Sequence, residues 1–138
     1  MKHFESNWRS KDGLSFYVQG WEPEKKPKAV VALIHGLGEH IGRYKHVGEA
    51  LNNAGYVLIG FDLRGHGKSG GVRGHVPSYK AVMDDIADFM ALVEKRYPGL
   101  PHFLYGHSMG GNEVINFCLR RKPEVARGIT NGGHGLGR

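Results

Sequence analysis

Ser108 has the clearest setting for chemistry in this sequence. It stands in Gly106-His107-Ser108-Met109-Gly110-Gly111, which contains the pattern Gly-x-Ser-x-Gly. A strand-like run from His102 to Tyr105 comes before the pattern, and a segment with helical spacing follows it. A serine on a strained turn between a strand and a helix exposes its hydroxyl, as in a nucleophile elbow. We therefore predict that Ser108 is the nucleophile of an acyl-transfer reaction.

Acyl transfer also requires N–H donors that stabilise the developing oxyanion. In a strand-elbow-helix arrangement, one donor is the amide of the residue after the nucleophile, here Met109. The other comes from the loop after an earlier strand, and His35-Gly36-Leu37-Gly38 follows such a run. Glycines let the main chain approach a substrate without an intervening side chain. We predict that the amide of Leu37 is the second donor.

Short apolar runs and amphipathic segments alternate along the chain and position these loops. The expected elements are a hairpin over 3–21, strands over 29–34, 56–61 and 102–105, helices over 44–54, 78–97 and 110–121, and a strand that begins near 126. In the helix over 78–97, we expect Tyr79 on the apolar face and Asp85 mostly away from it. This alternation predicts an α/β fold with a mainly parallel sheet flanked by helices. Ligands of such sheets bind at the carboxyl ends of strands. The glycine-bearing loops 35–38, 62–71 and 106–111 all follow strands at such ends.

Length and composition predict one globular domain over residues 1–138, with 40% hydrophobic residues and a net charge of +6. The basic residues are dispersed and lack interleaved aromatics, which argues against nucleic-acid binding. Cys118 is the single cysteine, so no intrachain disulfide can form. Without an apolar leader or a long apolar stretch, we expect a cytoplasmic protein with no stable membrane insertion. The spacing of the histidines predicts no metal site, so we expect them to serve in loop packing and hydrogen bonding, and we expect no cofactor.

Three separate motifs resemble one family. His35-Gly36-Leu37-Gly38-Glu39-His40 with Arg43-Tyr44, the segment from Phe61 to Gly70, and Gly106–Gly111 are similar to the monoacylglycerol lipase and lysophospholipase group of α/β-hydrolases, which is often grouped with the S33 serine aminopeptidases. The resemblance implies an α/β-hydrolase fold and hydrolysis of a small, lipid-like carboxylic ester. It also implies that Leu37 and Met109 form the oxyanion hole. Asp62 matches a structural segment of the family, so we do not expect it to be the triad acid.

The chain departs from this family after Ser108. Triads of α/β-hydrolases follow the order Ser, then Asp or Glu, then His. The later acidic residues are Glu113 and Glu124, and the later histidine is His134. Neither glutamate follows a later strand, and His134 falls in the glycine-rich segment 131–138, which we expect to be an irregular tail. We identify no triad acid or base, and we interpret the chain as a hydrolase truncated before its lid and last strands.

Two alternatives remain open alongside a serine esterase. A fragment without its acid and base could be catalytically incompetent or could serve as a non-catalytic binding protein. Gly65-His66-Gly67-Lys68-Ser69 is similar to part of a phosphate-binding loop, but Asp62 stands where that loop requires glycine.

A sheet that ends early also leaves an edge strand with unpaired backbone groups, so we expect self-association through that edge.

Overall fold

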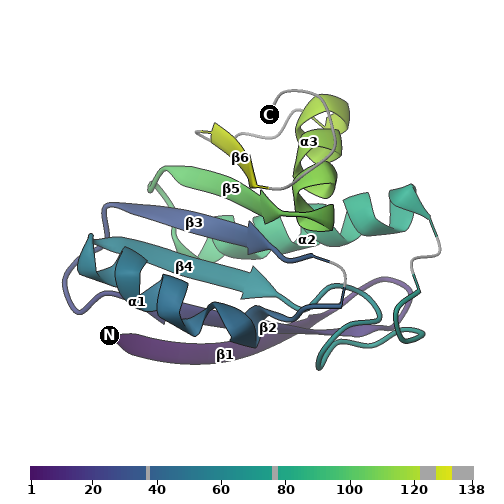
Figure 1. Cartoon of the computed structure of the whole chain (residues 1–138), viewed down its shortest axis with the longest axis horizontal. Helices are drawn as coiled ribbons and strands as arrows, with labels where there is room; N and C mark the ends of the chain where they lie inside the picture. Colours follow the sequence, from purple (N-terminus) through teal and green to yellow (C-terminus); the bar gives the residue numbers. More distant parts are fainter. Residues whose placement is uncertain (37, 76–77, 122–126, 132–138) are drawn as a thin grey trace.

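Six strands form one sheet, in the order β1-β2-β4-β3-β5-β6, in the computed structural model (Figure 1). The structure describes residues 1–36, 38–75, 78–121 and 127–131. The strands are β1 (Lys2–Arg9), β2 (Ser15–Glu22), β3 (Ala29–Ile34), β4 (Tyr56–Phe61), β5 (His102–His107) and β6 (Arg127–Asn131). The predicted strands are therefore confirmed, and the segment near 126 does enter a strand. Asn131, which was expected in the irregular tail, is the last residue of β6, and residues 132–138 of that tail lie outside the described residues.

The sheet is antiparallel at its amino-terminal end and parallel elsewhere. β1 and β2 form the expected hairpin, and β2 pairs antiparallel with β4. The pairs β3–β4, β3–β5 and β5–β6 are all parallel. Because parallel strands end at the same edge, the loops after β3, β4 and β5 gather there. The mainly parallel sheet predicted from the sequence is confirmed.

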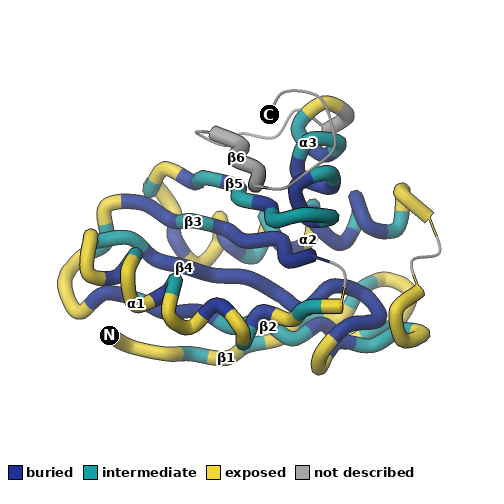
Figure 2. The backbone as a smooth tube through the Cα atoms, viewed as in Figure 1, coloured by how far each residue is buried: buried dark blue, intermediate teal, exposed yellow. Residues whose placement is uncertain are grey.

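Helices cover both faces of this sheet (Figure 1). A short 3-10 helix, η1 (Ile41–Tyr44), leads into α1 (Lys45–Asn53) on one face. α2 (Tyr79–Arg96) and α3 (Met109–Arg121) lie on the other face. Each face has its own hydrophobic core: Trp21, Leu33 and Leu58 belong to the α1 side, and residues of α2 and α3 pack on the opposite side. The central strands are accordingly buried along most of their length (Figure 2).

The longest helix, α2, begins as the sequence predicts but differs in which residues it buries. The Ser78 hydroxyl caps it by accepting the Ala81 N–H at 3.1 Å. Tyr79, which was expected on the apolar face, is 55% exposed because burial of the helix begins one turn later, at Val82. Asp85 was expected mostly away from the core, yet it is buried. Its burial is explained by an ion pair with Arg64, described below.

Candidate active site

Ser108 lies on a one-residue turn between β5, which ends at His107, and α3, which begins at Met109. Its φ angle is +55°, and within the described part of the chain no other non-glycine residue has a positive φ. This left-handed conformation is costly for a residue with a Cβ atom, and such outliers cluster at functional sites. The backbone at Ser108 therefore has the strained geometry expected of a nucleophile elbow.

Two glycines, Gly106 and Gly110, are required at this turn because neighbouring backbone atoms leave no room for a Cβ atom at either position. A Cβ atom on Gly106 would come within 2.2 Å of the Gly110 oxygen. A Cβ atom on Gly110 would come within 2.1 Å of the Ile34 oxygen, at the end of β3. Both positions therefore exclude any other residue, and the pattern Gly-x-Ser-x-Gly reflects how closely the start of α3 approaches β3 and β5.

The loop after β3 meets this turn directly. A Cβ atom on Gly36 would lie 3.3 Å from the Ser108 Cβ and 3.2 Å from the His107 carbonyl oxygen. Leu37, the predicted oxyanion donor in this loop, lies outside the described residues. Met109 begins α3, and the amides of Gly111 and Asn112 donate to the Ser108 carbonyl. The first N–H groups of a helix have no carbonyl partner within that helix, and Met109 supplies the first of them in α3.

His35 joins the loops after β3 and β4. Its Nδ1–H donates to the Gly36 carbonyl at 2.7 Å, and its Nε2 accepts the Leu63 N–H at 2.8 Å. The ring is fully buried, and this burial lowers the pKa of His35 to about 4. These contacts require a neutral imidazole in one tautomer, so His35 fixes the loop geometry and is not a proton acceptor for Ser108. The sequence had suggested only packing or hydrogen bonding for the histidines.

Asp62 fixes the loop after β4. One carboxylate oxygen accepts the Ile41 N–H at 2.7 Å, and the other accepts the Lys68 N–H at 2.9 Å. Gly67 allows this, because a Cβ atom there would come within 2.3 Å of the carboxylate. With both oxygens bound to backbone amides and the side chain buried, Asp62 has a structural role.

Of the residues considered as triad acid and base, the structure describes Glu113 alone. Glu113 is buried on α3 with 6% exposure, and its Oε2 has no hydrogen-bond partner in that part. Glu124 and His134 lie outside the described residues. Burial raises the pKa of the Glu113 carboxyl to about 7. Glu113 is therefore a buried acid within the helix after the elbow.

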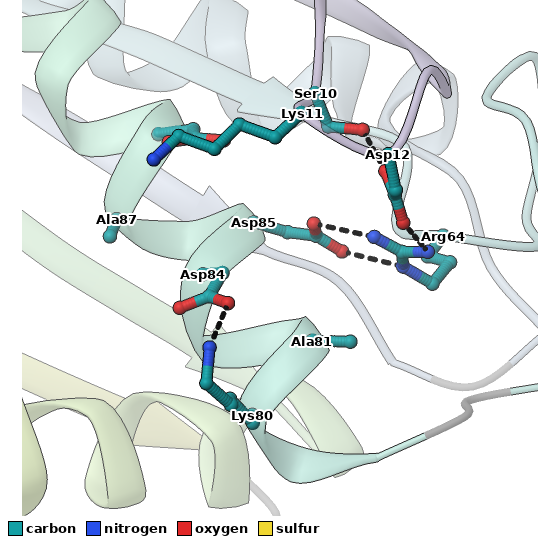
Figure 3. A pocket seen from close by; sticks show the side chains of 10 residues that line it. Ser10, Lys11, Asp12, Arg64, Lys80, Ala81, Asp84, Asp85 and Ala87 are labelled. Atoms are coloured by element: carbon teal, nitrogen blue, oxygen red, sulfur yellow. Dashed lines mark hydrogen bonds and ion pairs between the residues drawn. The ribbon is translucent and has the colours of Figure 1, made fainter.

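Several cavities border these loops in the described part of the chain, and two of them differ clearly in their lining. One, of about 440 Å³, is lined by glycines together with Glu39, His66 and Arg73, beside the loop after β3. The other, of about 360 Å³, lies between the β1–β2 turn and α2 (Figure 3). There Arg64 holds Asp85 through two hydrogen bonds of 3.0 Å and Asp12 through a third of 2.8 Å. Across the described ranges, histidines, cysteines and carboxylates form no metal-binding group.

The mixed sheet, with its helices on both faces and its turn at Ser108, places this protein in the class of α/β-hydrolases. A solved structure of a soluble variant of monoglyceride lipase from Saccharomyces cerevisiae superposes with a TM-score of 0.82 at 30% identity, covering 96% of this chain and 45% of that one. A thermostable carboxyl esterase from Bacillus coagulans superposes with a TM-score of 0.84 at 29% identity, covering 94% of this chain and 44% of the esterase. The α/β-hydrolase fold inferred from the motifs is confirmed.

Within that class, the chain belongs to the family described as "Serine aminopeptidase, S33", whose profile matches residues 25–133. Among characterised relatives, the monoacylglycerol lipase of Mycolicibacterium smegmatis is 34% identical over 128 residues, which are 93% of this chain and 46% of the relative. Human monoglyceride lipase is 39% identical over 115 residues, 83% of this chain and 38% of the human protein. The chain thus spans less than half the length of these relatives. None of its described helices is long and apolar enough to cross a membrane.

Proposed function

We propose that this chain carries the nucleophile and the oxyanion-stabilising loop of a serine hydrolase for lipid esters, of the monoacylglycerol lipase or lysophospholipase type. The observation that carries the proposal is Ser108, held at a φ of +55° between β5 and α3 and in contact with the loop after β3. The relatives named monoacylglycerol lipases support the ester class of substrate. The single cysteine suits a reducing compartment, and we propose the cytoplasm.

In this mechanism the Ser108 Oγ attacks the ester carbonyl carbon and passes its proton to a base. The carbonyl oxygen becomes an oxyanion that accepts hydrogen bonds from the amides of Met109 and Leu37. The tetrahedral intermediate collapses, the alcohol leaves with the proton, and an acyl-serine remains. Water then attacks the acyl-serine, releasing the fatty acid and restoring the Ser108 hydroxyl. The positive end of α3 adds to the stabilisation of the oxyanion.

The base and its orienting acid have no assigned residues in this chain. Removing a triad member costs on the order of 10⁴- to 10⁶-fold in turnover, while the oxyanion hole and substrate binding retain roughly 10³- to 10⁴-fold over water. We therefore expect weak, measurable esterase activity from this chain. The second candidate is a hydrolase-derived chain without turnover, favoured by the burial of Glu113 away from any paired histidine in the described residues.

Turnover of a short-chain nitrophenyl ester tests this function. This chain, its Ser108→Ala variant and a full-length monoacylglycerol lipase would be compared at matched concentration. We expect turnover far below that of the full-length enzyme and a further fall to the background rate in Ser108→Ala. A rate identical in the parent chain and in Ser108→Ala would refute the proposed nucleophile, and a rate equal to that of the full-length enzyme would refute the missing base.

A further inference from the structure

The side chain of Glu39 folds back onto the main chain of its own loop. Its Oε1 accepts the Gly36 N–H at 2.7 Å and the Tyr44 hydroxyl at 2.9 Å. The Glu39 N–H in turn donates to the Gly36 carbonyl at 3.1 Å. Two reciprocal hydrogen bonds therefore close the loop from Gly36 to Glu39, and Gly38 within it has a φ of +75° that suits a tight turn.

Both polar groups of Gly36 are held by these contacts. The N–H bonds to Glu39, and the carbonyl accepts from the Glu39 amide and from the His35 Nδ1–H. These contacts therefore fix Gly36, which lies beside Ser108 and directly precedes the residue that we propose as an oxyanion donor.

The charge on Glu39 strengthens this arrangement. Although burial opposes ionisation, the Gly36 N–H and the Tyr44 hydroxyl lower the pKa of Glu39, with help from His107 and Arg43. The Arg43 guanidinium lies 3.7 Å from the second carboxylate oxygen. At neutral pH the bond to Gly36 is thus charge-assisted, which makes it stronger than a bond between neutral groups.

We propose that Glu39 is a positioning residue for the oxyanion loop, because its carboxylate holds Gly36 against Ser108. This inference rests on the proposed function, since positioning matters only if Ser108 reacts. Glu39 itself does not exchange protons with the substrate. A displacement of about 1 Å in a reacting geometry can cost on the order of 10²-fold in rate. Loss of the hydrogen bond between the Glu39 carboxylate and the Gly36 N–H is therefore expected to lower the reactivity of Ser108 without preventing folding.

The kinetics of Ser108 modification by an alkyl fluorophosphonate test the proposal. Ser108 displaces fluoride from phosphorus, and the phosphoryl oxygen occupies the oxyanion hole. The adduct on the Ser108 peptide is quantified by mass spectrometry over time and probe concentration, which separates the maximal rate from the affinity for the probe. Four variants are compared with the parent chain: Glu39→Ala, Glu39→Asp, Glu39→Gln and, as an exposed control on α1, Glu49→Ala.

These variants separate the effect of side-chain length at position 39 from the effect of its charge. Glu39→Asp keeps the charge but shortens the side chain, while Glu39→Gln keeps an oxygen at the position that accepts from Gly36 and Tyr44. We expect Glu39→Ala and Glu39→Asp to lose roughly 10- to 100-fold in maximal rate with unchanged probe affinity. Glu39→Gln retains most of the rate, and Glu49→Ala retains all of it. Glu39→Asp keeps the test valid if Glu39→Ala does not fold.

The outcomes are distinguishable. If Ser108 of the parent chain is labelled no faster than the other serines, the proposed function fails and this inference fails with it. If Ser108 is labelled and Glu39→Asp matches the parent rate, only the positioning role is refuted. A loss confined to probe affinity would also refute it, because that result would make Glu39 a ligand contact.

Discussion

Glu113 should make the stability of this protein depend on pH in a direction that can be measured. Its carboxyl is 6% exposed on α3, and burial raises its pKa from 4.5 to about 7. The folded state therefore binds the proton more tightly than the unfolded state does. The contribution of Glu113 to the free energy of unfolding is greatest below about pH 4.5. This contribution is lost as the pH rises toward 7, because the buried carboxyl must then ionise.

The size of this effect follows from the same two values. Between pH 4.5 and pH 7, each pH unit lowers the free energy of unfolding by about 1.4 kcal/mol, so the total is about 3 kcal/mol. Glu113→Gln keeps the shape and removes the ionisation. We expect the variant and the parent to have similar free energies of unfolding at pH 4.5. At pH 8 we expect the variant to be about 3 kcal/mol more stable than the parent.

Urea denaturation followed by circular dichroism at several pH values would measure this difference. Taking the difference between parent and variant cancels the titration of the other groups. Glu49→Gln, an exposed glutamate on α1, is the matched control and should show no pH-dependent difference. If the difference in free energy of unfolding between Glu113→Gln and the parent stays constant from pH 4.5 to pH 8, the conclusion that burial raises the pKa of Glu113 is refuted.

Three further predictions concern the frame around the site. Arg64→Ala should destabilise the fold by about 3–5 kcal/mol because it leaves the buried Asp85 carboxylate unpaired, and Arg64→Met combined with Asp85→Leu should recover most of that loss in urea denaturation. Gly110→Ala should destabilise the protein more than Gly99→Ala in thermal melts, because a Cβ atom on Gly110 would strike the Ile34 oxygen whereas Gly99 has open space around it. Equal losses of stability in the two variants would contradict this packing. We also propose self-association through the edge strand β6, seen as concentration-dependent elution in size-exclusion chromatography, whereas a stable monomer at all concentrations would argue against it.

The sequence predicted the frame of this protein well because its signals there are local. The apolar runs 29–34 and 56–61 coincide with β3 and β4, and the glycines around Ser108 predicted a sharp turn, which the structure has between β5 and α3. Contacts between distant segments carry no such signal. The ion pair of Arg64 with Asp85 spans 21 residues and buries a carboxylate that periodicity assigned to the polar side of α2.

The contacts of Glu39 with Gly36 and Tyr44 also escaped prediction, for a different reason. Glu39 was recognised only as part of a family motif, although its carboxylate bonds to Gly36 three residues earlier. A glutamate in a loop is usually solvated, and its fold-back depends on Tyr44 in η1. These hydrogen bonds therefore became visible only with the fold.

The site of fluorophosphonate attachment tests the central claim most directly. After incubation of the parent chain with the probe, the protein is digested and each serine-containing peptide is quantified by mass spectrometry. We predict that the adduct lies on Ser108, in preference to the exposed serine Ser15 and the buried serine Ser69, and that it disappears in Ser108→Ala. An adduct spread evenly over the serines, or one that persists in Ser108→Ala, would contradict the assignment of Ser108 as the nucleophile.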